Sequence, residues 1–284
     1  MLTIENEFLK VSVNPLGAEL SAVTSQKDGY EFMWSGDPDV WSGHSPLLFP
    51  VVGRLKGDRY EYEGKSYSMP KHGFIQREQF DCTAKTDTSL TLTFDRWETY
   101  ESCYPFRYRL DVIFTLKDGL LFVSHKVSNL QEKPMYFSLG AHPAFRCLPG
   151  GYLEFEKAET LQAHRFDDQK IIRPEKDPFL NKESVYRLLP HTFDDDAYVL
   201  EGFRSSFLWV RNPAENRSVK VHFGGAPYLG IWAKPAAPYV CIEPWFGLDD
   251  DYEQSGVLRE KKGIVALPPK ETFTFTYSIE PSVN

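Results

Sequence analysis

The sequence contains no long apolar run, no basic stripe and no closely spaced pair of cysteines. A transmembrane helix needs about 18 or more consecutive apolar residues, and no such run occurs. The first residues also lack the basic and apolar parts of a signal peptide. We therefore expect a cytoplasmic protein with no membrane partner. A net charge of -8 without a basic patch argues against nucleic acid as a partner as well.

Metal-binding and cofactor-binding motifs are absent too. The four cysteines form no Cys-x-x-Cys pair, so we expect reduced and mostly buried thiols. The seven histidines form neither a His-x-His nor an HExxH pattern. Glycine-rich phosphate loops and a Gly-x-Ser-x-Gly nucleophile turn are also missing. The sequence therefore predicts no bound metal and no cofactor.

Aromatic residues and alternating patterns dominate what is present. Hydrophobic residues make up 42% of the 284 residues and aromatic residues 15%, so a large core rich in strands is expected. Apolar and polar residues alternate from residues 9–13 at one end of the chain to 273–279 at the other, the pattern of half-buried strands. Asp118-Gly119 predicts a hairpin between residues 106–116 and 121–127. Further strands are expected at 90–94, 207–210 and 219–223.

Helices are not expected, because no stretch of 12 residues has a convincing amphipathic helical period. Residues 163–191 carry Pro174, Pro178 and several turn-forming residues, which predicts a long irregular surface excursion. Alternation resumes after this region, with no internal repeat. We therefore predict one all-β domain over residues 1–284, a large antiparallel β-sandwich with few short helices.

Glu243 is the most unusual charged residue, because it lies in the apolar run Tyr239 to Trp245, which predicts a buried strand ending at Pro244. A buried carboxylate without a partner would cost several kcal/mol or take up a proton. Two interpretations are equally consistent with the sequence: a general base with a shifted pKa, or a structural ion pair with an arginine.

Two histidines lie in glycine-rich contexts. His142, in Gly-Ala-His-Pro, is expected at a strand end, where imidazole can donate a proton near neutral pH. His72, in Lys-His-Gly-Phe, belongs to a predicted turn. A lone histidine at such a position is more often structural, and neither residue decides the function alone.

Other polar and aromatic residues are candidates for substrate binding. Arg54 follows a Pro-Val-Val-Gly segment and offers a planar donor fork for hydroxyl groups, although an exposed arginine is commoner there. Asp195 and Asp196 belong to an acidic run that is usually solvated. Trp232 is among the tryptophans that suit stacking on a sugar ring, although core packing is their commoner role.

These segments together resemble the aldose 1-epimerase (galactose mutarotase) family, particularly its LacX-like branch. The resemblance spans nearly the whole chain, and each motif is weak alone, but their common order is specific. The motifs are Phe49-Pro-Val-Val-Gly-Arg54, Lys71-His-Gly-Phe74, Gly140-Ala-His-Pro143, Asp195-Asp-Ala197 and Cys241-Ile-Glu-Pro-Trp245. The chain differs from the better-known galactose mutarotases, which carry Asn-Arg-Ile where it has Gly53-Arg54-Leu55 and a second glycine where it has Phe74.

The resemblance implies a β-sandwich with a cleft across one sheet and assigns roles to individual residues. The family's general base falls on Glu243, its proton-donating histidine on His142 and its second histidine on His72. The substrate arginine falls on Arg54. The sugar-binding aspartate falls on Asp195, with Asp196 as the close alternative.

The resemblance thus implies interconversion of the α and β anomers of a free hexose, with the small sugar as the partner and the protein a monomer or a homodimer. Glu243 and His142 would act as base and acid. One alternative is a sugar-phosphate 1-epimerase, in which Lys56, Arg59, Lys71 and Arg77 would bind phosphate. Another is a non-catalytic carbohydrate-binding or sensing protein of the same fold. A glycosidase is less consistent, because it needs paired carboxylates and only one is well placed.

Overall fold

The fold is described by a computed structural model that covers residues 1–283, and it is built almost entirely from antiparallel strands. The strands are β1 (Leu2–Glu5), β2 (Leu9–Asn14), β3 (Glu19–Ser25), β4 (Leu47–Leu48), β5 (Arg59–Tyr62), β6 (Lys65–Ser68), β7 (Asp81–Lys85), β8 (Ser89–Phe94), β9 (Tyr108–Lys117), β10 (Leu120–Asn129), β11 (Met135–Phe137), β12 (Leu139–Ala141), β13 (Ala144–Arg146), β14 (Tyr152–Phe166), β15 (Ile172–Arg187), β16 (Tyr198–Glu201), β17 (Phe207–Asn212), β18 (Arg217–His222), β19 (Tyr228–Trp232), β20 (Tyr239–Phe246), β21 (Val265–Leu267) and β22 (Thr272–Val283). The helices are single 3₁₀ turns: η1 (Lys56–Asp58), η2 (Ile75–Arg77), η3 (Trp97–Tyr100), η4 (Pro213–Glu215) and η5 (Leu258–Glu260).

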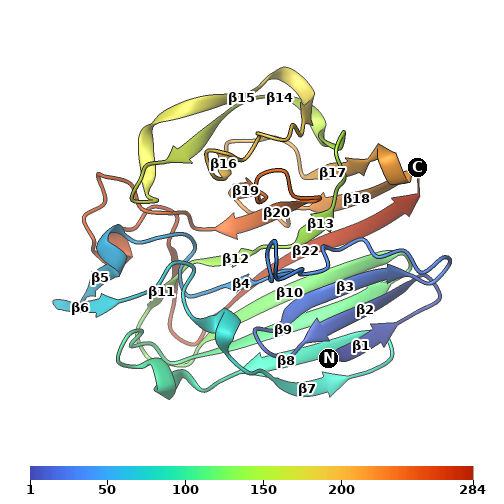
Figure 1. The fold of residues 1–284 in the computed structure, drawn as a ribbon. Helices are drawn as coiled ribbons and strands as arrows, with labels where there is room; N and C mark the ends of the chain where they lie inside the picture. Colours follow the sequence, from blue (N-terminus) through green and yellow to red (C-terminus); the bar gives the residue numbers. More distant parts are fainter. Residues whose placement is uncertain (284) are drawn as a thin grey trace.

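One large sheet of 15 strands organises the molecule. Its order is β4-β12-β20-β19-β16-β14-β17-β18-β22-β10-β9-β8-β7, while β13 pairs with β20 and β15 with β14. The sheet runs from β7 at the bottom of Figure 1 to the β14–β15 arch at the top. The antiparallel β-sandwich predicted from the alternation is confirmed.

A second sheet, β1-β2-β3, covers the lower half of the large one (Figure 1, blue). Val11, Val13 and Val23 on this sheet are fully buried. They belong to the same core as Leu110, Val112 and Phe114 of β9, so the two layers share one interior. The alternation that predicted strands in these segments reflects one face in the core and one in solvent.

The predicted hairpins are confirmed, with small shifts at their ends. β9 and β10 pair antiparallel around Asp118-Gly119, with Leu116 opposite Leu121 and Leu110 opposite Val127. β9 begins at Tyr108, two residues later than the pattern suggested. β17 and β18 pair across the turn that contains η4, and Leu90-Leu92-Phe94 lies in β8.

The prediction of an irregular excursion at residues 163–191 is wrong. Most of this region belongs to a long hairpin, in which β14 pairs with β15. Pro174 and Pro178 are tolerated because β15 pairs with β14 alone, so it can lack ladder donors along its other side. Register shifts interrupt the pairing at several points, and these irregularities weakened the period-two signal in the sequence.

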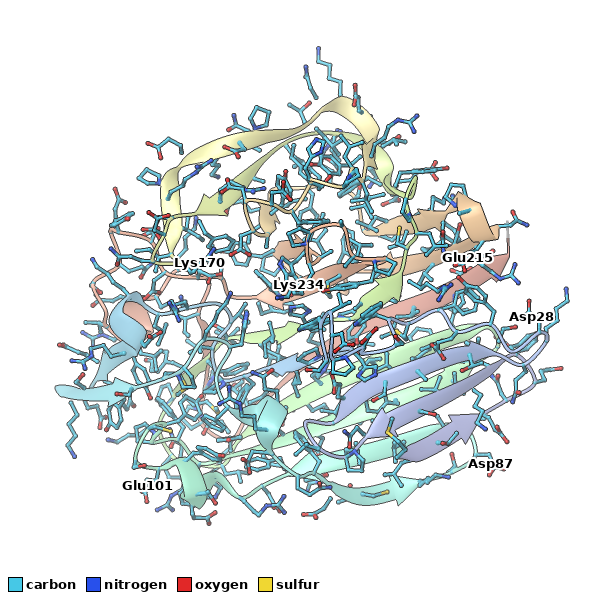
Figure 2. All side chains as sticks on the ribbon, in the orientation of Figure 1. Asp28, Asp87, Glu101, Lys170, Glu215 and Lys234 are labelled. Carbon is cyan, nitrogen blue, oxygen red and sulfur yellow. The ribbon has the colours of Figure 1, made fainter. Side chains whose placement is uncertain are left out.

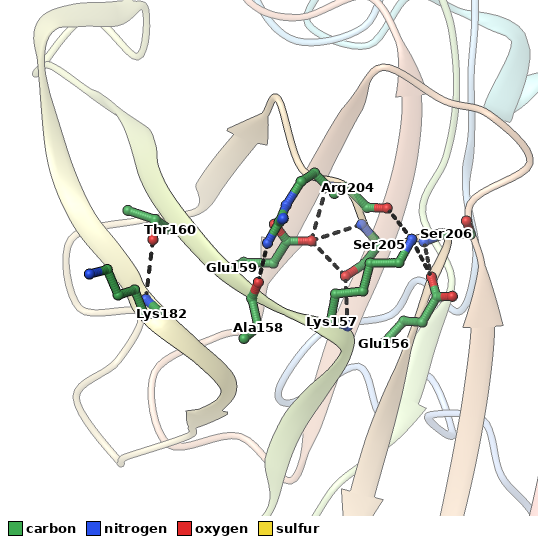
Figure 3. A network of polar contacts seen from close by, with 9 residues as sticks. All are labelled: Glu156, Lys157, Ala158, Glu159, Thr160, Lys182, Arg204, Ser205 and Ser206. Atoms are coloured by element: carbon green, nitrogen blue, oxygen red, sulfur yellow. Dashed lines mark hydrogen bonds and ion pairs between the residues drawn. The ribbon is translucent and has the colours of Figure 1, made fainter.

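A buried carboxylate holds β14 at one of these irregularities (Figure 3). Glu159 is 2% exposed, and its Oε1 accepts hydrogen bonds from the backbone N–H groups of Arg204 and Ser205 and from the Ser205 hydroxyl. Three donors to one oxygen compensate for burial of the charge. The loop before β17 is thereby fixed against the hairpin.

All four cysteines are free, and two of them, Cys147 and Cys241, are buried. Cys103 is half-buried and Cys82 is exposed, so the expectation of mostly buried thiols holds for only part of the set. Among residues 1–283, no helix is long and apolar enough to cross a membrane.

Candidate active site

A cavity of about 340 Å³ opens where the ends of several strands and loops meet. This volume lies within the range of small-molecule sites. Residues from four of the five sequence motifs meet in it. The lining residues are Trp41, Pro46, Leu48, Lys71, His72, Gln76, His142, Phe166, Asp196, Ala197, Trp232, Glu243, Trp245 and Asp249.

Glu243 reaches the cavity from the buried strand β20, and its side chain is only 2% exposed. The strand prediction is confirmed, but Pro244 does not end the strand, which continues to Phe246. Proline is accommodated there because the neighbouring edge is interrupted between β12 and β13, so no partner strand needs its missing N–H on that side. Within residues 1–283 no arginine forms an ion pair with Glu243, so the structural ion-pair interpretation is not supported.

His142 occupies that interruption between β12 and β13. Its Nε2 lies 3.2 Å from Oε2 of Glu243, and its side chain is 12% exposed. The rings of Trp41 and Trp232 lie 5.3 and 5.7 Å from the imidazole, centre to centre. Residues 101 positions apart thus form one acid–base pair walled by indole rings.

Burial shifts both members of this pair towards their neutral forms. Desolvation raises the pKa of Glu243 well above its usual value, while Lys71 acts in the opposite direction. Desolvation lowers the pKa of His142 to about 3. At neutral pH the His142 ring is therefore neutral, and Glu243, 3.2 Å away, is shifted towards its protonated form. Two titratable groups so close together form an arrangement that general acid–base catalysis can use.

His72 lies on the other side of His142, with the two ring centres 6.2 Å apart. The backbone N–H of Gly53 donates a hydrogen bond of 3.0 Å to Nδ1 of His72. Burial lowers the pKa of His72 well below its usual value, so the ring is neutral. Because Nδ1 accepts a hydrogen bond, the single ring proton must be on Nε2, which makes Nε2 a hydrogen-bond donor.

Gly53 is required at its position by both its conformation and its surroundings. Its φ is +72°, and a Cβ there would lie 2.2 Å from Cγ of Asp249. Asp249 is buried, and its Oδ1 accepts the Arg54 backbone N–H at 2.7 Å. The first motif therefore touches the site through its backbone, and Asp249 links it to the end of β20.

The Arg54 side chain does not line the cavity, contrary to the prediction that its guanidinium points into a pocket. Its Nε lies 3.3 Å from Oδ1 of Asp58, and Nη1 donates to the carbonyl of Gln169. The side chain is 37% exposed. The backbone bonds of Arg54 to Asp249 and Asp250 fix its main chain and leave the side chain facing the surface.

Of the two candidate aspartates, the structure brings Asp196 to the cavity and leaves Asp195 outside it. The Asp195 side chain is 72% exposed. Asp196 accepts the Ala197 N–H and pairs with Lys170 at 2.8 Å. Burial alone would raise the pKa of Asp196, but these two partners outweigh it and the pKa is lowered. The geometry therefore favours Asp196 over Asp195, although the sugar-binding role of either residue stays a prediction.

The β14–β15 hairpin, which the sequence pattern did not predict, forms part of the cavity wall. Phe166, the last residue of β14, lines the cavity. Lys170, which holds Asp196, lies in the turn between β14 and β15 (Figure 2). Arg165 is buried and donates to the Asp195 carbonyl at 2.6 Å. The aspartate loop is thus held in place by a segment that the sequence pattern assigned to an irregular excursion.

Trp232 lines the cavity as predicted, with its ring 5.3 Å from that of Trp41. Sequence reasoning missed Asp249, Gln76 and Phe166. The Leu-Asp-Asp run at 248–250 follows β20 directly, a weak signal that its carboxylates could turn towards Glu243. Nothing in the local pattern distinguishes Gln76 or Phe166 from surface residues.

Lys71 is the one lysine or arginine among the lining residues. Three carboxyl groups also line the cavity, those of Asp196, Glu243 and Asp249. The other three residues considered as phosphate ligands do not line the cavity: Lys56 donates to the Tyr252 carbonyl, and Arg59 and Arg77 are exposed. The cavity therefore offers a single basic side chain to a ligand.

Phe74, where galactose mutarotases carry a second glycine, packs into the interior. Its ring lies parallel to that of Tyr100, with the centres 3.7 Å apart. It is 6% exposed and does not line the cavity. The departure from the galactose mutarotase pattern therefore changes packing beneath the second motif.

Comparison with protein families and known structures agrees with the fold and the motif order. The family model for aldose 1-epimerase matches residues 1–280. The plasmid-encoded protein LacX of Lactococcus lactis subsp. lactis is 29% identical over 98% of each chain. A galactose mutarotase-related enzyme from Lactobacillus acidophilus is 32% identical, with a TM-score of 0.93 over 100% of this chain and 98% of that one.

Two further structures extend the comparison. A galactose mutarotase-like protein from Lactobacillus casei has a TM-score of 0.92 at 28% identity, covering 99% of this chain and 100% of that one. A galactose 1-epimerase from Lactobacillus acidophilus has a TM-score of 0.71 at 14% identity, over 99% and 93% of the two chains. The second similarity is one of fold alone.

Proposed function

The chain belongs to the aldose 1-epimerase family, and from that premise we propose that it interconverts the α and β anomers of a free hexose. The observation that carries this proposal is the Glu243–His142 contact of 3.2 Å inside a cavity of sugar size. Neither group alone is decisive. A base and an acid 3.2 Å apart beside an aromatic-lined cavity can remove and supply protons on one small substrate.

In the proposed reaction Glu243 acts as a carboxylate and His142 as an imidazolium, a pair that forms when the carboxyl proton of Glu243 passes to His142. Glu243 takes the proton of the C1 hydroxyl while His142 gives a proton to the ring oxygen, and the C1–O5 bond breaks to give the open aldehyde. Rotation about C1–C2 exposes the other face of the carbonyl. On closure, His142 takes the C5 hydroxyl proton and Glu243 returns its proton to the carbonyl oxygen. The protein ends as it began, so no cofactor is consumed.

The remaining cavity residues have supporting roles in the proposal. Nε2 of His72 donates to a sugar oxygen and stabilises charge that develops on it. Asp196 accepts hydrogen bonds from hydroxyl groups, and Trp232 stacks on the apolar face of the ring. The cationic role that the resemblance implies for Arg54 passes to Lys71 in this proposal.

Free hexose is favoured over hexose 6-phosphate because the cavity has few cationic donors. Lys71 is the one lysine or arginine that lines it, whereas a phosphate site typically uses several donors, often arginine forks. A non-catalytic sugar-binding protein would not need an adjacent carboxyl group and imidazole, each desolvated at a cost to its charged form.

Polarimetry on freshly dissolved α-anomers tests the proposal. Catalytic amounts of protein should accelerate mutarotation of glucose or galactose, whereas glucose 6-phosphate should equilibrate at its uncatalysed rate. Acceleration of the phosphate alone would support the sugar-phosphate alternative. Sugar binding detected as a rise in melting temperature, without acceleration of any sugar, would support the non-catalytic alternative.

A further inference from the structure

Cys241 lies behind the acid–base pair and is not used by the proposed mechanism. It precedes Glu243 by two residues on β20, so both side chains extend from the same face of the strand. The thiol is fully buried. The ligand atoms of His142, Cys241 and Glu243 all lie within 4.8 Å of one another. A sulfur, a nitrogen and a carboxylate oxygen thus lie close together, and two of the three residues, His142 and Glu243, line the cavity.

This donor set matches the chemistry of zinc sites. Zinc is bound by cysteine, histidine and carboxylate ligands at about 2.0–2.3 Å, so tetrahedral ligand atoms lie roughly 3.3–3.6 Å apart. The His142–Glu243 distance of 3.2 Å is close to this spacing. The sulfur lies within 4.8 Å of both other ligand atoms, so side-chain shifts of at most about 1.5 Å would bring it to this spacing. His142 and Glu243 line the cavity, which leaves a fourth position open to water.

We propose that His142, Cys241 and Glu243 form an inhibitory site for a thiophilic divalent cation such as Zn²⁺. The ion enters from the cavity and binds the imidazole, the carboxylate and the thiolate, and the thiol proton and the carboxyl proton of Glu243 are released to solvent. The ion uses the lone pairs that would accept protons from the sugar. Metal and catalysis therefore exclude each other. Local spacing in the sequence misses this site because His142 lies 99 positions before Cys241.

Cobalt absorption tests the site directly. Full-length protein is treated with a chelator, freed of it and titrated with CoCl₂, because a cysteine–cobalt bond gives a charge-transfer band that nitrogen and oxygen ligands do not. Zn²⁺ affinity is then measured by displacement of cobalt. Cys241→Ser should abolish the band and weaken Zn²⁺ binding at least about tenfold, because the soft ligand is lost. Cys147→Ser, which alters a buried cysteine outside the cavity, should change neither.

Cobalt binding without the band, or equal Zn²⁺ affinity in wild type and Cys241→Ser, would overturn the proposal. Cys241→Ala provides the same comparison if the serine variant fails to fold. The inhibition itself rests on the proposed function: ZnCl₂ should slow mutarotation by wild type and be about tenfold less potent on Cys241→Ser, relative to the metal-free rate of each protein. Spectra need no activity, so failure of the metal site and failure of the epimerase proposal are distinguishable.

Discussion

Replacement of Glu243 by glutamine separates the catalytic role of this residue from its structural role. The amide keeps the size of the side chain, which is 2% exposed. It cannot accept the C1 hydroxyl proton at neutral pH. General acid–base groups contribute about 10²- to 10⁴-fold, so the mutarotation rate should fall by at least about 10². That corresponds to about 2.7 kcal/mol or more of lost transition-state stabilisation.

Glu243→Gln should lose activity but gain thermal stability relative to wild type at neutral pH. The pKa of Glu243 is raised in the folded protein by burial. Such a group takes up a proton on folding, so its favourable contribution is present at low pH and is lost as pH rises above about 4.5 through the raised folded pKa. Glu243→Gln has no such loss. Its melting temperature should equal that of wild type near pH 4 and exceed it increasingly towards neutrality.

The assays are polarimetry at neutral pH and thermal unfolding across the acid range, with sugar binding measured by calorimetry as the control. Binding should persist in Glu243→Gln. A variant that turns over like wild type would refute the mechanism. A variant that is less stable than wild type at neutral pH would show that the carboxylate has a stabilising partner, against the burial argument.

Three further variants address the cavity and the core. Asp196→Asn should raise the KM for the sugar about tenfold through a weakened hydrogen bond, while Asp195→Asn should not; equal effects would restore the first choice of aspartate. Lys71→Met should move the acid limb of the kcat/KM profile to higher pH, because Lys71 lowers the Glu243 pKa, and Arg54→Ala should leave that limb in place. His125→Leu removes a buried imidazole whose pKa is lowered to about 3 by burial, so wild type should lose stability relative to this variant as pH falls from 6.5 towards 3. Urea titrations of both proteins at neutral and acid pH measure this, and an equal difference in unfolding free energy at the two pH values would contradict the prediction.

Strands that alternate cleanly were predictable because their two faces meet different environments. β9 and β10 show the pattern at every second residue and were found with their turn. β14 and β15 were not, because register shifts and two prolines disrupt the period in a strand paired on one side only. That residues 1–284 form a single domain stays a prediction.

Site residues were predictable where a charged group had to occupy an apolar strand or a tight turn. Glu243 and His142 stand out in this way, and the structure places them together. Arg54 and Asp195 did not reach the cavity, because side-chain direction depends on partners far away in sequence. Asp249 sets the backbone of Arg54, and Lys170 selects Asp196 over its neighbour. No local pattern contains that information.

The central claim is that this chain exchanges the anomers of a free hexose through Glu243 and His142, and magnetisation-transfer NMR at equilibrium measures that exchange directly. With glucose or galactose present, inversion of the α-anomeric proton signal should pass to the β signal at a rate proportional to the concentration of wild-type protein. The same concentration of Glu243→Gln should leave the rate at least about 10² lower. Exchange no faster than in buffer with wild-type protein and any free hexose would contradict the account.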